Sequence, residues 1–246
     1  MRTKSASSGE TLDTLLNGRL SIVQRRDGYR FSLDALLLAH FVGLGGRERI
    51  VDLGTGNGVI AMFLASLHPN CRIVGLEVQE AMVERARRSV EINRLQERVN
   101  ILHGDVRSIT GLLPPKSFDA VVCNPPYRGP KTGRMNPDVE RRLARHEIKG
   151  SVADFLRAGA YVLRPKGRMT LVYPAVRAVD LLHHMRLERM EPKRLRWVHS
   201  FRDSEAKLVL VEGTKGGRCE LEVMRPLVVY TVDRQYTAEV KAMLGE

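Results

Sequence analysis

The stretch Arg49-Ile-Val-Asp-Leu-Gly-Thr-Gly-Asn-Gly58 decides the fold class of this sequence. Its first five residues are mostly apolar and predict a short buried strand over residues 49–53. The glycines that follow allow a tight turn and a close approach of the backbone to a ligand. A helix is predicted directly afterwards, over residues 59–67. The stretch therefore predicts a strand, a turn and a helix, in which the turn can cradle a nucleotide.

The same alternation of strand and helix continues along the chain. Further strands are predicted at residues 71–77, 99–102, 118–123 and 168–173, with two or three late strands at 194–200, 207–213 and 220–230. Further helices are predicted at residues 32–41, 80–93, 151–163, 175–190 and 237–244. Strands joined by helices of roughly a dozen residues imply right-handed crossovers and a parallel sheet covered on both faces. We expect the α/β class: a doubly wound, mostly parallel seven-stranded sheet with a late antiparallel strand.

The composition favours one globular domain and a negatively charged partner. With 246 residues, 43% of them hydrophobic, residues 1–246 can form a single large domain. The formal net charge is +12, and residues 128–202 hold 18 basic against 7 acidic side chains. Such an excess is typical of proteins that meet nucleic acid or an anionic surface.

The cysteines and the apolar segments exclude several other classes. Cys71, Cys123 and Cys219 form no Cys-x-x-Cys pair, so neither a disulfide framework nor a zinc ribbon is indicated, and we expect no metal. Residues 1–11 are polar, and the most apolar run, residues 35–44, is too short to span a bilayer. We therefore expect a cytoplasmic protein without a membrane partner.

Acidic residues occur at the ends of the predicted strands on either side of the glycine turn in sequence. Glu77 ends the second strand, 19 residues after Gly58, where its carboxylate can accept both hydroxyl protons of a ribose. Asp105 follows the third strand, so that with Asp52 three acids lie at three successive strand ends. Val59 stands where the dinucleotide fingerprint requires Gly or Ala, which disfavours nicotinamide and flavin cofactors. An uncharged nucleoside is the expected ligand, although ordinary loop chemistry also explains any one of these acids.

The fourth predicted strand ends in Asn124-Pro-Pro-Tyr127. Prolines fix an extended turn, which leaves the Asn124 side-chain carbonyl and the Pro125 main-chain carbonyl as two acceptors facing the ligand. Two such acceptors can bind both hydrogens of an exocyclic amine and favour the positive charge that develops on its nitrogen. Tyr127 can stack on a displaced base. The alternative is a strand end braced by proline, with a packed tyrosine.

Basic residues follow this turn. They are Arg128, Lys131 and Arg134, and then Arg141, Arg142 and Arg145 on a predicted helix at 138–147. Beside a base-binding site they would clamp RNA phosphates, although a solvated helix face explains any single one. A second cluster, Lys193-Arg-Leu-Arg-Trp197 with His199 and Arg202, could extend this surface, but a tryptophan at position 197 is more often part of the core.

The combined motifs resemble those of class I S-adenosylmethionine-dependent methyltransferases that methylate amines. The resemblance rests on Val51–Gly58, Glu77, Gly104-Asp105 and Asp119–Tyr127. The chain looks closer still to the bacterial tRNA adenine-N6 methyltransferase family that modifies the adenosine beside the anticodon of a valine tRNA. The additional likeness lies in Gln24–Ala39, Ala144-Arg-His-Glu147, Glu212–Gly217 and Pro226–Tyr230, so that it covers nearly the whole chain.

The resemblance implies a Rossmann-like methyltransferase fold, S-adenosylmethionine as cofactor, and RNA, most plausibly tRNA, as partner, with no obligate protein partner. Asp52, Gly54 and Gly56, with Asn57 beside them, would contact the methionine part of the cofactor, Glu77 the ribose and Asp105 the adenine. Phe31, Ser32 and Asp34, within a cofactor-closing segment at 1–45, would cover the methionine end. Asn124 would face both cofactor and target base, and Pro125 and Tyr127 would hold the base. Residues 128–149 would be a basic substrate-binding insertion.

Three alternatives remain open at this point. The same Asn-Pro-Pro-Tyr turn serves enzymes that methylate a glutamine amide in release factors, and enzymes that methylate adenine in DNA. The glutamine enzymes carry a longer N-terminal helical domain, and the DNA enzymes usually add a target-recognition domain. A catalytically silent RNA-binding module is the third alternative, because a fold does not by itself imply function.

Overall fold

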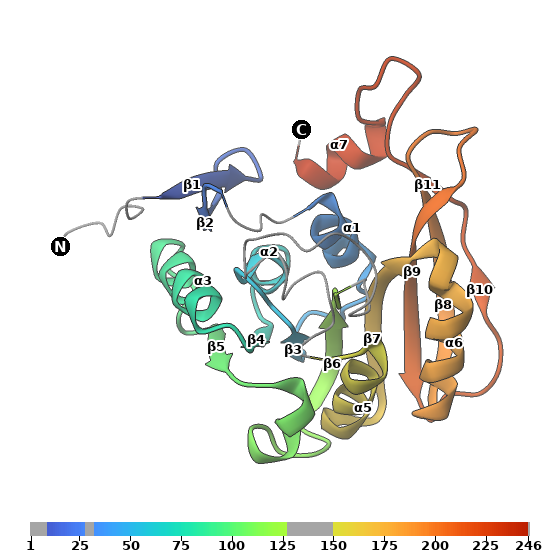
Figure 1. Ribbon diagram of the computed structural model, residues 1–246, viewed down its shortest axis with the longest axis horizontal. Helices are drawn as coiled ribbons and strands as arrows, with labels where there is room; N and C mark the ends of the chain where they lie inside the picture. Colours follow the sequence, from blue (N-terminus) through green and yellow to red (C-terminus); the bar gives the residue numbers. More distant parts are fainter. Residues whose placement is uncertain (1–8, 28–31, 127–149, 246) are drawn as a thin grey trace.

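The computed structural model describes residues 9–27, 32–126 and 150–245 of the chain (Figure 1). Five strands form the parallel part of its main sheet. They are β3 (Arg49–Leu53), β4 (Arg72–Glu77), β5 (Val99–His103), β6 (Phe118–Cys123) and β7 (Leu163–Pro174), in the spatial order β7-β6-β3-β4-β5. The strand order reverses between β3 and β6, which is where open α/β sheets bind their ligands.

The sheet continues on the far side of β7. β9 (Ala206–Lys215) lies beside β7, and β8 (Met190–His199) lies beside β9. β9 pairs antiparallel with both neighbours, and this confirms the predicted late antiparallel strand. The predicted strand at 220–230 is reduced to two short pieces, β10 (Glu222–Val223) and β11 (Leu227–Val228), which pair with the outer edge of β8. Pro226 lies between them and has no N–H to continue the ladder.

Helices cover both faces of the sheet, as the alternating pattern predicted (Figure 1). One core contains buried residues of α1 (Leu33–Phe41), α2 (Val59–Leu67), α3 (Glu80–Ile92) and α7 (Ala238–Leu244). The other core contains buried residues of the 3₁₀ helix η1 (Val106–Gly111), α5 (Val152–Val162) and α6 (Ala178–Leu187), which the 3₁₀ turn η2 (Ala175–Arg177) precedes. Within the described ranges no helix is long and apolar enough to cross a membrane.

A β-hairpin near the N-terminus was not expected from the sequence. β1 (Glu10–Leu15) and β2 (Leu20–Arg25) pair antiparallel and lie against α3. The main-chain N–H of Val23 donates to Ser89 Oγ (2.9 Å), and that of Ser21 donates to Asn93 Oδ1 (2.8 Å). These partners lie far along the chain, so no local pattern in the hairpin reveals them.

An ion pair between a buried carboxylate and a half-buried guanidinium joins the end of α1 to the late strands. Glu212 on β9 is buried, and its Oε1 accepts from Arg194 Nε on β8 at 3.0 Å. The same carboxylate accepts from Thr170 Oγ1 and from the Gly43 N–H, each at 3.3 Å. Arg194 also donates through Nη2 to the carbonyl oxygen of Phe41 (2.9 Å). One carboxylate and one guanidinium therefore fix the end of α1 against three strands.

Replacing Arg194 should be costly, because Glu212 would keep a buried charge without its partner. We expect Arg194→Met to lower the free energy of unfolding by about 3 kcal/mol in urea titrations. The matched control is Arg186→Met, which breaks the exposed pair with Glu191 and should cost less than about 1 kcal/mol. Equal losses in the two variants would contradict the structural role of the buried pair.

Candidate active site

The register of the parallel strands brings the predicted site residues to one edge of the sheet. Leu53, Leu76, Leu102 and Cys123 are register partners across β3, β4, β5 and β6. The next residue on each strand is at the carboxyl edge, and these include Gly54, Glu77 and Asn124. Neighbouring strands are about 4.8 Å apart, so the glycine turn lies between Glu77, the last residue of β4, and Asn124, which follows β6.

The glycine turn is bonded to the end of the neighbouring strand. The N–H groups of Gly54 and Thr55 both donate to the carbonyl oxygen of Leu76, at 2.8 and 3.0 Å. Gly54 has a φ of +73°, and a Cβ built there would lie 3.1 Å from the ring of Phe155 on α5. Sequence reasoning did not identify Phe155, because it lies 101 residues further along the chain. The Phe155 ring therefore packs directly against the glycine turn.

Thr55 connects the turn to Asp52. The Thr55 hydroxyl donates to Asp52 Oδ2 at 2.6 Å. The side chain of Thr55 lies directly over Gly75 on β4, where a Cβ would come within 2.8 Å of it. Neither Thr55 nor Gly75 was predicted as a site residue, yet both are needed to place the Asp52 carboxyl.

Asp52 itself is an unusual buried acid. Its side chain is fully buried, and Oδ1 has no hydrogen-bond partner among the described residues. Burial raises the pKa of Asp52 to about 7, with a smaller contribution from the negative charge of Glu77 and an opposing one from the Thr55 hydroxyl. A positively charged ligand group near Oδ1 would stabilise the ionised form.

Glu77 holds the turn and keeps its capacity to accept further bonds. Its Oε2 accepts from the Gly56 N–H (3.0 Å), and its Oε1 accepts from the Gln79 N–H (2.9 Å). Burial raises the pKa of Glu77 although these bonds oppose the shift. Each carboxylate oxygen has a second lone pair, so the group can still accept two hydroxyl protons, as a ribose would require.

Unpaired amide groups lie beside these acids. Asn57 is buried, and neither its Oδ1 nor its Nδ2 has a partner among the described residues. The Oε1 of Gln79 is also buried and has no hydrogen-bond partner among the described residues. A buried polar atom without a partner costs about 1–3 kcal/mol, which a polar ligand can offset. Together with Asp52 Oδ1, these atoms fit a ligand that carries an amine, hydroxyls and a base, such as the expected S-adenosylmethionine.

Asp105 lies at the same edge but has local partners. The Gly104 N–H donates to the Glu77 carbonyl oxygen (2.9 Å), which brings this loop beside the end of β4. Asp105 caps η1 by accepting from the Arg107 N–H, and it forms an ion pair with the Arg107 side chain at 2.6 Å. Its contact with an adenine ring stays a prediction.

The predicted cofactor-closing residues lie on α1. Arg194 binds the Phe41 carbonyl at the end of α1, and the chain then enters the amino end of β3. The helix therefore runs against the parallel strands, which places Ser32 and Asp34, at its start, toward the carboxyl edge. Phe31 lies outside the described residues.

The target-binding turn is described only in part. Asn124 is half-buried and Pro125 is buried, directly after β6. Tyr127, the predicted helix at 138–147 and the whole insertion at 128–149 lie outside the described residues. This also applies to the predicted phosphate-binding residues, which are Arg128, Lys131, Arg134, Arg141, Arg142 and Arg145.

The second basic cluster has internal partners. Lys193 donates to the Arg218 carbonyl (3.1 Å), Arg194 pairs with Glu212, and Arg196 pairs with Glu239 (2.8 Å). Trp197 packs against the core, as expected. Three basic residues of this cluster thus have partners within the chain, and its contribution to an RNA surface stays a prediction.

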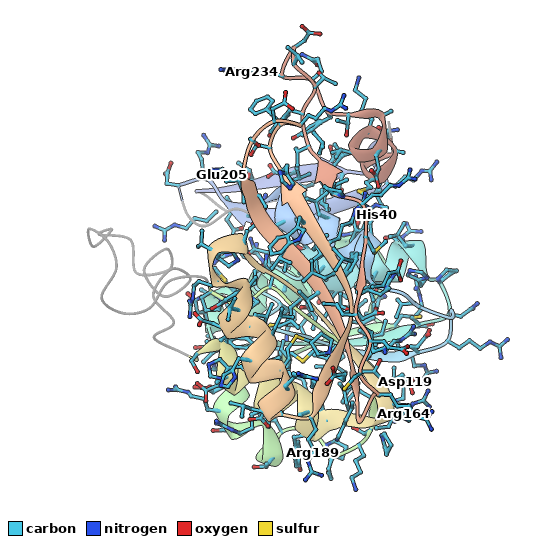
Figure 2. The ribbon with its side chains drawn as sticks, turned by 90° about the vertical axis from the view of Figure 1, so that its right-hand side faces the viewer. His40, Asp119, Arg164, Arg189, Glu205 and Arg234 are labelled. Atoms are coloured by element: carbon cyan, nitrogen blue, oxygen red, sulfur yellow. The ribbon has the colours of Figure 1, made fainter. Side chains whose placement is uncertain are left out.

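Two further basic residues of the segment 128–202, Arg164 and Arg189, lie away from the candidate site. Figure 2 shows Arg164 and Arg189 with Asp119 at the end of the molecule opposite Glu205 and Arg234. Arg164 is the second residue of β7 and Arg189 directly precedes β8, so both lie at the amino edge of the sheet. These two basic side chains of residues 128–202 therefore lie away from the carboxyl edge. Within the described ranges no cluster of His, Cys, Asp or Glu could hold a metal ion.

Comparison with known sequences identifies similar proteins. The family model described as methyltransferase small domain matches residues 32–186. A Porphyromonas gingivalis protein named tRNA1(Val) (adenine(37)-N6)-methyltransferase is 31% identical over 200 residues, which are 79% of this chain and 78% of that protein. A protein of the same name from Tolumonas auensis is 28% identical over 162 residues, covering 65% of this chain and 66% of its own.

Solved structures share the fold. A predicted O-methyltransferase from Agrobacterium tumefaciens superposes with a TM-score of 0.70 at 24% identity, covering 85% of this chain and 94% of that one. Geranyl diphosphate C-methyltransferase from Streptomyces coelicolor, solved with S-adenosyl-L-homocysteine, has a TM-score of 0.54 at 15% identity, covering 74% and 78%. At these identities the likeness shows the fold, and it confirms the predicted Rossmann-like architecture.

The raised pKa of Asp52 makes stability depend on pH. Between its ordinary value of 3.8 and about 7, the folded protein keeps a proton on Asp52 that the unfolded chain releases. The stability from this group is complete below pH 3.8 and is lost as the pH rises through 7. We expect the unfolding free energy of the wild type, relative to Asp52→Asn, to fall by on the order of 4 kcal/mol from pH 4 to pH 8.

Urea titrations at a series of pH values measure this difference. The control is Asp233→Asn, at an exposed position of the tip at 231–235, which should leave the pH profile of the wild type unchanged. Parallel profiles for the wild type and Asp52→Asn would contradict the assignment.

Proposed function

The chain belongs to the methyltransferase small domain family and is an S-adenosylmethionine-dependent methyltransferase, and from this premise we propose that it methylates the N6 amine of an adenine in tRNA. The observation that carries the proposal is the pairing of Leu53 with Cys123. It places the Asn124 turn after β6 directly beside the glycine turn after β3, at the carboxyl edge of the sheet. The names of its relatives point to adenosine 37 of a valine tRNA as the substrate.

In this proposal, residues at three strand ends bind different parts of the cofactor. The turn after β3, with Asp52 and Asn57, binds the methionine part, and Glu77 accepts the ribose hydroxyls. Asp105 reaches the adenine, and α1 with Ser32 and Asp34 covers the methionine end. Phe31 is proposed to complete this cover. The buried unpaired atoms of Asp52 and Asn57 support this assignment, because a polar ligand would satisfy them.

The Asn124 turn is proposed to hold and activate the target amine. The lone pair of an adenine amine is delocalised into the ring, so the amine is a weak nucleophile. The carbonyl oxygens of Asn124 and Pro125 accept its two hydrogens, which positions the nitrogen and stabilises the charge that develops on it. Tyr127 is proposed to stack on the base. When bound, S-adenosylmethionine would supply the methyl group by cleavage of its sulfonium S–CH3 bond, which leaves the thioether S-adenosylhomocysteine, and the methylated nitrogen would release one proton to water.

Basic residues of the insertion at 128–149 are proposed to clamp the RNA around the target. The glutamine-amide and DNA alternatives use the same turn, but the relatives' names favour RNA over both. The intact set of acids and glycines supports an active enzyme rather than a silent binding module.

Transfer of labelled methyl from S-adenosylmethionine to total RNA, taken from a strain that lacks this protein, tests the proposal. Labelled N6-methyladenosine in the tRNA fraction is the expected result. Label in release factors or DNA, with unlabelled RNA, would overturn the proposed substrate.

Asn124 should matter for turnover and not for the fold. We expect Asn124→Ala to lower kcat by about 100-fold or more, because one of the two acceptors for the amine is lost. Cofactor affinity, measured by calorimetry, should change far less. Asn70→Ala, an exposed asparagine before β4 at the opposite edge, is the matched control and should keep normal turnover. Normal turnover of Asn124→Ala would refute the mechanism.

Gly54 should matter for cofactor binding. Gly54→Ala combines a positive φ with a Cβ 3.1 Å from the Phe155 ring, so either the turn or the ring must shift. We expect the dissociation constant for S-adenosylmethionine to rise at least about 10-fold in calorimetry. Gly46→Ala has a φ of +108° but no atom within 4 Å of the new Cβ, and it controls for backbone strain alone. Equal affinities for Gly54→Ala and Gly46→Ala would argue against a role of the turn in binding.

A further inference from the structure

The carboxyl edge of the sheet has two halves. The residues assigned to the cofactor follow β3, β4 and β5, whereas Asn124 follows β6 at the boundary. The segments that follow β7 and β8 lie on the other side of Asn124. These segments therefore flank Asn124 on the side away from the residues assigned to the cofactor.

On this second half the strands extend beyond the level of Asn124. Cys123 at the end of β6 is level with Leu171 on β7, with Val211 on β9 and with Leu195 on β8. β7 continues for three residues past this level and β8 continues for four. At about 3.3 Å per residue, the two strands rise some 10 to 13 Å above the end of β6.

Three aromatic rings lie at the top of this extension. Phe201 follows β8, and its ring centroid lies 5.7 Å from that of Tyr230. The rings of Tyr230 and Tyr236 are stacked, 5.3 Å apart at an interplanar angle of 17°. We call Phe201, Tyr230 and Tyr236 the aromatic platform. Glu205, in the same loop as Phe201, and Arg234, between the two tyrosines, mark this end of the molecule in Figure 2.

Main-chain hydrogen bonds hold the platform in place. The Tyr230 N–H donates to the Ser200 carbonyl (2.9 Å), and Tyr230 and Tyr236 form an antiparallel bridge that closes the tip between them. Ser204 fixes the loop after β8, because its hydroxyl accepts from the Phe201 N–H (3.0 Å). The rings are thus presented by a fixed backbone.

The platform has an exposed face, and the charges around it cancel. Phe201 is 37% exposed, whereas Tyr230 and Tyr236 are partly buried against the core. The loop at 200–205 holds Arg202 against Asp203 and Glu205, and Lys207 at the start of β9 balances the remaining charge. Exposed rings on a neutral surface suit a flat, uncharged group. They do not suit a phosphate.

We propose that the aromatic platform stacks an unpaired base of the RNA whose adenine is methylated at Asn124. The proposal rests on the proposed function and deepens it, because it requires a substrate with unpaired nucleotides beyond the target. Three strand spacings and the rise of β8 place Phe201 on the order of 20 Å from Asn124, a span of a few nucleotides. Stacking on aromatic side chains is a usual way of holding unpaired bases.

The test uses Phe201, because the two tyrosines also pack against the core. We expect Phe201→Leu to weaken binding of a valine tRNA transcript about 5- to 20-fold in filter binding, with an equal rise of KM and an unchanged kcat. Phe201→Trp should bind at least as well as the wild type. Because stacking is not electrostatic, the loss should be the same at low and high salt. A phosphate contact would lose its importance as salt rises.

Val232→Ala is the matched control, because Val232 is 95% exposed on the tip between the two tyrosines but has no ring. Its affinity should equal that of the wild type. The emission of 2-aminopurine, placed within a few nucleotides of the target, should be quenched by the wild type and not by Phe201→Leu.

Unchanged RNA affinity and KM in Phe201→Leu would overturn the platform. An equal loss in Val232→Ala would also overturn it, because that loss would show a general effect of the surface. In either case methylation of tRNA by the wild type would leave the proposed function standing. A wild type that does not methylate RNA would remove both.

Discussion

Two main-chain hydrogen bonds, from Gly54 and Thr55 to the carbonyl oxygen of Leu76, are the constraint on which the site depends. They tie the turn after β3 to the end of β4 and so set where Glu77 begins to leave the sheet. Glu77 in turn accepts from the Gly56 N–H, so turn and acid hold each other. The left-handed backbone at Gly54 and the ring of Phe155 beneath it leave no room for a side chain there.

Several buried polar atoms at the carboxyl edge of the sheet have no hydrogen-bond partner among the described residues. Asp52 is buried with one bonded and one unbonded oxygen, and both amide atoms of Asn57 are buried without partners in the described part of the chain. A folded protein tolerates such costs where a ligand removes them. These atoms therefore offer hydrogen-bond partners to a polar nucleoside cofactor, and contact of its positive charge with the Asp52 carboxyl is part of our proposal.

The late strands contribute a structural ion pair and a group of aromatic rings. Glu212 and Arg194 form an ion pair that fixes the end of α1. Glu212, the first residue of the motif at 212–217 that resembles the tRNA methyltransferases, thus has a structural role. Arg164 and Arg189 lie at the opposite edge of the sheet. At the carboxyl edge the late strands extend past the end of β6, and the aromatic platform lies beyond them. In our proposal these rings stack an unpaired base.

The sequence by itself determined the alternation of strand and helix, the glycine turn, and the positions of Glu77 and Asn124 at strand ends. These features are local, because a strand that ends in a turn is written in consecutive residues. Only the tertiary structure revealed the β1–β2 hairpin, the packing of Phe155 against the glycine turn, and the internal partners of Arg194. Each of these depends on residues that are distant in sequence and adjacent in space, and no local periodicity encodes such a contact.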